Sequence, residues 1–97
     1  MIGWNYMTKV KYYANLRLIT GKIDDEIEAD GKTVEDIIQM LSSKYGDSFN
    51  KLMFSDGSLR GNVIILINGQ NIIFKNGVKE KLGKGDLLDI FPPVAGG

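Results

Sequence analysis

A single amphipathic helix, expected over residues 34–45, constrains the fold of this chain more than any other sequence feature. Apolar side chains recur along it with the i, i+3, i+4, i+7 spacing of one helical face, at Val34, Ile37, Ile38, Leu41 and Tyr45. Thr33 is a typical N-cap, acidic residues occupy the first turn, and Gly46 is suitably placed for a C-terminal cap. A lone helix can bury such a stripe only against another layer, so the rest of the chain must supply a sheet.

Alternating patterns typical of strands precede this helix. Residues 8–14 alternate, with Val10, Tyr12 and Ala14 on one face and Lys9, Lys11 and Tyr13 on the other. Gly21-Lys22 supplies a turn before residues 24–29, where Ile27 and Ala29 mark a second, more polar strand. Residues 15–19 are too few to assign. We expect the two strands to pair as a hairpin.

Three more strands are expected after the helix. Residues 49–54 suggest a short helical turn, and Asp56-Gly57-Ser58 is a turn signal. The β-branched run at residues 63–67 is typical of a buried strand, and Asn68-Gly69 indicates a hairpin that returns through residues 72–74. Residues 87–91 form the last strand. The order ββαβββ, with one main helix on a mixed sheet, predicts an α+β fold of the β-grasp type.

The composition excludes several classes of function. The 97 residues allow one domain, and 12 Lys+Arg against 12 Asp+Glu leave no basic field for binding nucleic acid or anionic lipid. The chain has no Cys, which excludes a disulfide scaffold, a thiolate nucleophile and thiolate metal sites. It also has no His, the commonest general base at neutral pH. We expect neither catalytic residues within the fold nor a bound cofactor.

The N-terminal residues and the longest apolar run bear on location. Residues 1–7 are expected to be an extension of unknown role, because Met7 could equally be the true start and the segment lacks the features of a signal peptide. The apolar run at residues 63–67 is far too short to cross a bilayer. We therefore expect a cytoplasmic protein with no membrane partner, folded over residues 8–91.

The last six residues do not fit the β-grasp pattern. Pro92-Pro93-Val94-Ala95-Gly96-Gly97 has the composition of a flexible, extended arm, because proline favours extended backbone. Six extended residues reach at most roughly 20 Å. The segment 92–97 is therefore expected to enter a pocket of a partner.

The ending Phe91-Pro92-Pro93-Val94-Ala95-Gly96-Gly97, after a ββαβββ pattern, resembles the small subunit of molybdopterin synthase and its relatives among the ubiquitin-like sulfur carriers. The resemblance covers residues 8–97, and it includes Leu66-Ile67-Asn68-Gly69 and the Gly85-Asp86 turn. Only residues 1–7 depart clearly from it.

This resemblance implies that a ubiquitin-activating-type enzyme uses ATP to adenylate the carboxylate of Gly97, which then becomes a thiocarboxylate. The large synthase subunit would accept the arm, and the sulfur would pass to cyclic pyranopterin monophosphate. Gly96 and Gly97 have no Cβ, so a channel can enclose their backbone closely. Related carriers imply thiamine synthesis or tRNA thiolation as alternatives. A modifier joined through Gly97 to target lysines, or a plain binding module, also stays open.

The last strand suggests where partners would dock. Leu88 and Ile90 share one face, while Leu87, Asp89 and Phe91 share the other, which Asp89 marks as the wetter one. Leu87 and Phe91 are then apolar groups away from the helix, and we expect them to bind partners together with Pro92, Pro93, Val94, Ala95 and Gly96. The alternative is a second small core beneath residues 49–54.

Two groups of charges have simpler interpretations. Asp24, Asp25, Glu26, Glu28 and Asp30 lack the spacing of a calcium loop, so we expect solvated hairpin charges and no metal site. The lysines at positions 75, 79, 81 and 84 could face an acidic partner, but turn lysines are usually solvated.

Overall fold

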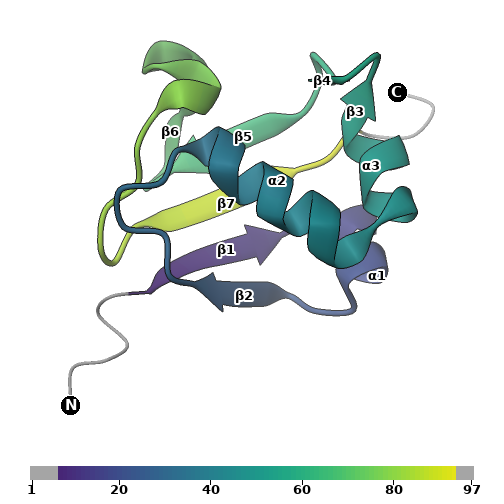
Figure 1. Cartoon of the computed structure of the whole chain (residues 1–97), viewed down its shortest axis with the longest axis horizontal. Coiled ribbons are helices and arrows are strands. Elements are labelled where there is room, and N and C mark those ends of the chain that lie inside the picture. Colours follow the sequence, from purple (N-terminus) through teal and green to yellow (C-terminus); the bar gives the residue numbers. More distant parts are fainter. Residues whose placement is uncertain (1–6, 94–97) are drawn as a thin grey trace.

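In the computed structural model, which describes residues 7–93, helix α2 (Val34–Tyr45) crosses one face of a five-stranded sheet (Figure 1). The strands lie in the order β2-β1-β7-β5-β6. Their bounds are β1 (Thr8–Tyr12), β2 (Asp24–Ile27), β5 (Ile64–Ile67), β6 (Gln70–Asn71) and β7 (Leu87–Phe91). The pair β1–β7 is parallel and the other neighbours are antiparallel. The predicted α+β β-grasp fold is confirmed.

Helix α2 begins and ends as its sequence predicts. The Thr33 hydroxyl accepts from the Asp36 amide at 3.1 Å, and the Asp36 carboxylate accepts from the Thr33 amide at 3.0 Å, which completes a capping box. The backbone hydrogen bond from Thr33 lowers the pKa of Asp36. At the other end, Gly46 has φ 74° and donates to the Ser42 carbonyl at 2.9 Å. Glycine adopts this positive φ without the steric cost that a Cβ adds.

The core lies between α2 and the sheet. Its fully buried members include Val34 and Ile37 from α2, Val10 and Tyr12 from β1, and Leu88 and Ile90 from β7. These residues are the inward-facing sets that the helical and strand periodicities predict. Burial of this apolar stripe holds the helix against the sheet.

The first strand is shorter than predicted, and a helix follows it. β1 ends at Tyr12, and Ala14 is exposed with φ 52°, so the expected extension of the strand to Ala14 is wrong. Residues 15–19, which could not be assigned from sequence, lie in α1 (Asn15–Thr20). Leu16 and Thr20 of α1 are buried. The chain leaves the sheet here because α1 packs against α3 (Asp47–Met53) and covers the end of the core.

The hairpin at Asn68-Gly69 is confirmed, but the returning strand expected at residues 72–74 is wrong, because the chain returns through the two-residue strand β6. Asn68 and Gly69 have φ 49° and 86°, and Ile67 pairs with Gln70 across them. Residues 72–74 form the 3₁₀ helix η2 (Ile72–Phe74), not a strand. The Asn71 side chain accepts from the Ile73 amide at 3.1 Å and so caps this helix. The second strand also ends early, at Ile27, although the predicted pairing of β1 with β2 is confirmed.

The segment between α2 and β5 contributes to the main core. Phe49 and Met53 of α3 are fully buried in the same cluster as α2, so the alternative of a second core beneath residues 49–54 is wrong. The predicted turn at residues 56–58 joins β3 (Phe54–Ser55) to β4 (Ser58–Leu59), and η3 (Gly77–Lys79) follows η2. None of the helices within residues 7–93 has the length and apolar character needed to span a membrane.

Candidate functional site

The face of the sheet opposite α2 carries the apolar side chains that sequence alternation placed there. Leu88 and Ile90 are buried towards α2, whereas Leu87 and Phe91 are half-buried on the opposite face. The register sets Ile64 of β5 opposite Phe91, and Ile64 is 46% exposed. We name Ile64, Leu66, Leu87 and Phe91 the open-face patch. Half-buried apolar groups gathered in this way are typical of a protein-docking surface.

Tyr13 covers one side of this patch. Its ring stacks on Phe91 with centroids 4.1 Å apart and planes 13° apart, and its hydroxyl donates to Asp89 at 2.9 Å. Asp89 is only 8% exposed, so the tyrosine supplies a partner for a buried carboxylate. Strand alternation sets Tyr13 apart from the inward-facing Tyr12 but indicates no role for it, because stacking between residues so far apart leaves no local signal in the sequence.

Two lysines of β1 beside the patch lie opposite acidic residues of β2. The register sets Lys9 opposite Glu26 and Lys11 opposite Asp24, across β1 and β2. Such cross-strand pairs stabilise a sheet modestly and leave little net charge. Apolar contact therefore dominates what this face offers a partner.

The patch continues towards the other edge of the sheet. Leu66 lines a shallow hollow together with Phe74, Lys75 and the turn residues Gly69, Gln70 and Asn71. The Phe74 side chain is 83% exposed, which is unusual for a phenylalanine outside an interface. The apolar surface thus extends from Phe91 at the end of β7 to Phe74 beyond β6.

The arm begins at the end of the strand that carries Leu87 and Phe91. Pro92 is buried and Pro93 half-buried, so the first two residues of the predicted arm are still attached to the domain. Val94, Ala95, Gly96 and Gly97 lie outside the described residues. Since β1 and β7 are parallel, Phe91 ends at the same edge as Tyr13, and the arm starts beside the patch.

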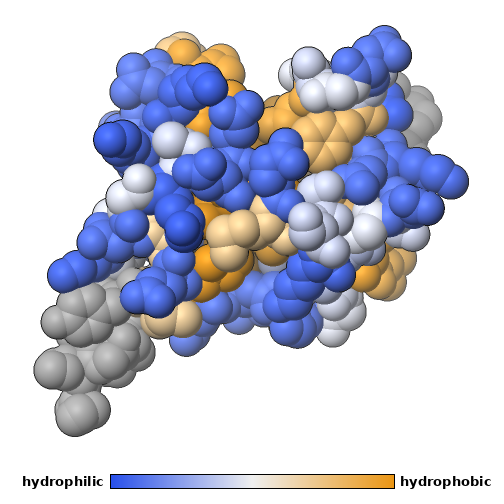
Figure 2. Space-filling model, in the orientation of Figure 1, coloured by the Kyte–Doolittle hydropathy of each residue, from blue (hydrophilic) through white to orange (hydrophobic). Residues whose placement is uncertain are grey.

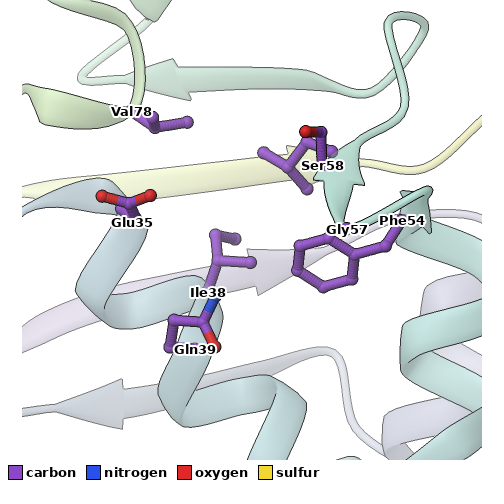
Figure 3. A pocket seen from close by; sticks show the side chains of 8 residues that line it. Glu35, Ile38, Gln39, Phe54, Gly57, Ser58 and Val78 are labelled. Carbon is purple, nitrogen blue, oxygen red and sulfur yellow. The ribbon is translucent and has the colours of Figure 1, made fainter.

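A separate pocket of about 150 Å³ lies on the α2 side, between α2, the β3–β4 hairpin and η3 (Figure 3). Ile38, Phe54 and Val78 point into it, and apolar surface shows in the notch above α2 in Figure 2. Among the described residues that line it, Glu35 alone is charged, and Lys79 binds it at 2.9 Å. Ligand sites usually span about 300–1,000 Å³, so this pocket holds no more than a side chain. It faces away from the open-face patch.

The acidic hairpin contains a buried carboxylate, contrary to the expectation of solvated charges. Asp25 is 7% exposed and accepts hydrogen bonds from Tyr12 and Tyr45, both at 2.6 Å, and from Lys22 at 2.7 Å. Burial alone would raise the pKa of Asp25, but these hydrogen bonds and the charge of Lys44 lower it well below its usual value. Within residues 7–93 no cluster of acidic side chains is arranged to hold a metal ion.

The comparisons with known proteins agree on one family. The model of the ThiS family matches residues 10–97. A relative from Archaeoglobus fulgidus, described as a candidate sulfur carrier protein, is 36% identical over 74 residues, which cover 76% of this chain and 84% of that protein.

Two solved structures share both fold and sequence with this chain. Small archaeal modifier protein 1 from Methanosarcina acetivorans matches with a TM-score of 0.81 and 35% identity, covering 94% of this chain and 96% of that one. A Pyrococcus furiosus protein, described as a candidate subunit 1 of a molybdopterin converting factor, matches with a TM-score of 0.71 and 31% identity, covering 91% and 98%.

Proposed function

The chain belongs to the ThiS family of ubiquitin-like sulfur carriers, and we propose that within this family it is the small subunit of a molybdopterin synthase. The observation that carries the proposal is a Phe-Pro-Pro-Val-Ala-Gly-Gly ending that follows β7 directly, next to the apolar face of the sheet. The similarity to the Pyrococcus furiosus protein supports the same acceptor.

The chemistry would take place on the last carbon of the chain. An α-carboxylate has a pKa of about 3.3–3.7, so at neutral pH it is an anion and a poor electrophile. A partner enzyme would let a Gly97 oxygen attack the α-phosphorus of ATP, with pyrophosphate leaving. A sulfur donor would then displace AMP from the acyl adenylate and leave a thiocarboxylate. The large synthase subunit would use that sulfur to build the dithiolene of molybdopterin.

The chain's own contribution would be delivery. It supplies neither a histidine nor a cysteine to this chemistry, so the activating and transferring groups would belong to its partners. Leu87 and Phe91 would dock on those partners while the part of the arm that follows the two prolines, up to Gly97, enters the active site. Glycine at positions 96 and 97 lets the enclosing channel approach the backbone.

A second candidate function is that of a ubiquitin-like protein modifier. The 35% identity with an archaeal modifier protein favours it, because the same terminal carboxylate would then form an isopeptide bond with target lysines. Both functions use adenylation of Gly97, and they differ in the acceptor.

Intact-mass analysis of the protein purified from its own cells separates the two functions. A free chain in which sulfur replaces one terminal oxygen supports the carrier. Tryptic peptides of other proteins bearing the arm on a lysine support the modifier. A chain lacking Gly97 is the matched control and should show neither. Incubating the thiocarboxylate form with the large subunit and cyclic pyranopterin monophosphate tests the acceptor, and absence of molybdopterin would contradict the proposed synthase role.

A further inference from the structure

We propose that Tyr13 is a positioning residue, which fixes, through Phe91 and Asp89, the direction in which the C-terminal arm leaves the sheet. The inference rests on the proposed function, because the arm matters only if it carries the reacting carboxylate. Its physical part concerns the isolated domain and can be tested without any partner.

Side-chain contacts hold Tyr13 against the end of β7. The ladder between β1 and β7 pairs Tyr12 with Ile90, and the next step of the register sets Tyr13 opposite Phe91. Beyond Tyr12 the chain is no longer strand, so the stacked ring and the hydroxyl bond to Asp89 replace the ladder there. These contacts connect Tyr13 to the last two outward-facing residues before Pro92.

The backbone after Tyr13 is arranged to hold this ring in place. Ala14 has φ 52° and ψ −136°, a conformation that L-residues rarely adopt. Such conformations persist where the surrounding structure determines them, and they gather at functional positions. The turn brings Arg17 of α1 back over the Tyr13 ring at 5.4 Å, while the Arg17 Nε donates to the Tyr12 carbonyl at 2.8 Å.

The consequence for the arm follows from its attachment. Phe91 has Ile64 on the β5 side and Tyr13 on the β1 side, so removing the tyrosine ring leaves one side of Phe91 open. Pro92 follows directly and is buried, so a rotation at Phe91 would shift the point at which the arm leaves the domain. A displacement of about 1 Å at a reacting centre can cost on the order of a hundredfold in rate.

The experiment compares Tyr13→Leu, which removes the stack and the hydroxyl, with Tyr13→Phe, which removes only the hydroxyl. Tyr45→Phe is the matched control, because it removes a Tyr–Asp hydrogen bond on the α2 side of the sheet. Two quantities are measured. One is the amide order parameter of Phe91 in the isolated protein by NMR. The other is the kcat and KM of ATP–pyrophosphate exchange with the adenylating enzyme of the same cells.

A positioning role predicts that Tyr13→Leu lowers kcat about tenfold or more, leaves KM nearly unchanged, and lowers the order parameter of Phe91. Tyr13→Phe should lower kcat a few-fold, since the hydroxyl orients the ring, and Tyr45→Phe should change neither quantity. If Tyr13→Leu does not fold, the comparison of Tyr13→Phe with the native protein tests the inference.

Two results would overturn the inference. A rise in KM with native kcat would make Tyr13 a simple contact with the partner. Native order parameters at Phe91 in both Tyr13 variants would show that the ring positions nothing. Absence of exchange with the native chain would instead contradict the proposed function, and the NMR comparison would still decide the role of Tyr13.

Discussion

The hydroxyl of Tyr12 donates a 2.6 Å hydrogen bond to Asp25 Oδ2, and the Tyr45 hydroxyl donates to the same oxygen. One carboxylate thereby connects β1, β2 and the C-terminal end of α2. Burial raises the pKa of Tyr12, and the hydrogen bond to Asp25 raises it further, so Tyr12 stays a neutral donor at physiological pH. The buried Asp25 carboxylate has hydrogen-bond partners for its oxygens, and these offset the free-energy cost of removing its charge from water.

Asp25→Asn should therefore destabilise the fold in a pH-dependent way. The folded pKa of Asp25 is lowered relative to about 3.9 in the unfolded chain. Its contribution is present above about pH 4 and is lost as pH falls towards the folded pKa. Urea unfolding at pH 7 should show a loss of about 1–3 kcal/mol, and the difference from the native protein should narrow at pH 3. A difference that does not change with pH would contradict this.

Phe91→Ala should weaken association with the adenylating enzyme by about 2 kcal/mol or more, because a central apolar anchor dominates such interfaces. Met40→Ala is the control, since Met40 is an exposed apolar residue on α2, away from the open-face patch. Titration calorimetry measures both affinities. Native affinity together with a large loss of stability would show that Phe91 acts only in packing against Tyr13.

Adding one alanine after Gly97 should nearly abolish adenylation. The extension leaves the fold and the open-face patch intact, but it moves the carboxylate by roughly 3.3–3.6 Å and puts a Cβ on the terminal residue. Deleting Gly97 should have the same effect. The measurement is ATP–pyrophosphate exchange at equal concentrations of folded protein. Equal exchange by the native, extended and truncated chains would contradict a reaction at the terminal carboxylate, and the chain would then be interpreted as a plain binding module.

Replacing Asn68 should separate backbone preference from hydrogen bonding. Its Oδ1 accepts from the Leu87 amide and its Nδ2 donates to Asp86, both at 2.9 Å, so the hairpin is bonded to the start of β7. Asn68→Gly loses these bonds but keeps the easy positive φ, whereas Asn68→Ala loses both. We expect Asn68→Ala to be less stable than Asn68→Gly by about 1 kcal/mol in thermal unfolding. The reverse order would contradict this account.

Sequence alone was sufficient where the determining interactions are local. The period and caps of α2, the Asn68-Gly69 turn, the alternation of β7 and the separation of Leu87 from Leu88 depend on neighbours a few residues away. These elements also determined the β-grasp order, because one apolar helix needs a sheet to cover. The arm stays a prediction beyond Pro93, because residues 94–97 lie outside the described residues.

Tertiary structure decided the features that depend on distant residues. β1 stops at Tyr12 because α1 packs on α3, and Asp25 is buried because Tyr45, twenty residues later, donates to it. The Tyr13–Asp89 bond joins residues 76 positions apart. The alternation of apolar and polar residues continues through Ala14, so the sequence gives no sign of the early end of β1 or of these distant contacts. A strand ends where packing of the following residues is more favourable than further strand pairing, and a charge is buried where other side chains replace its hydrogen bonds to water. Both depend on contacts that exist only in the folded chain.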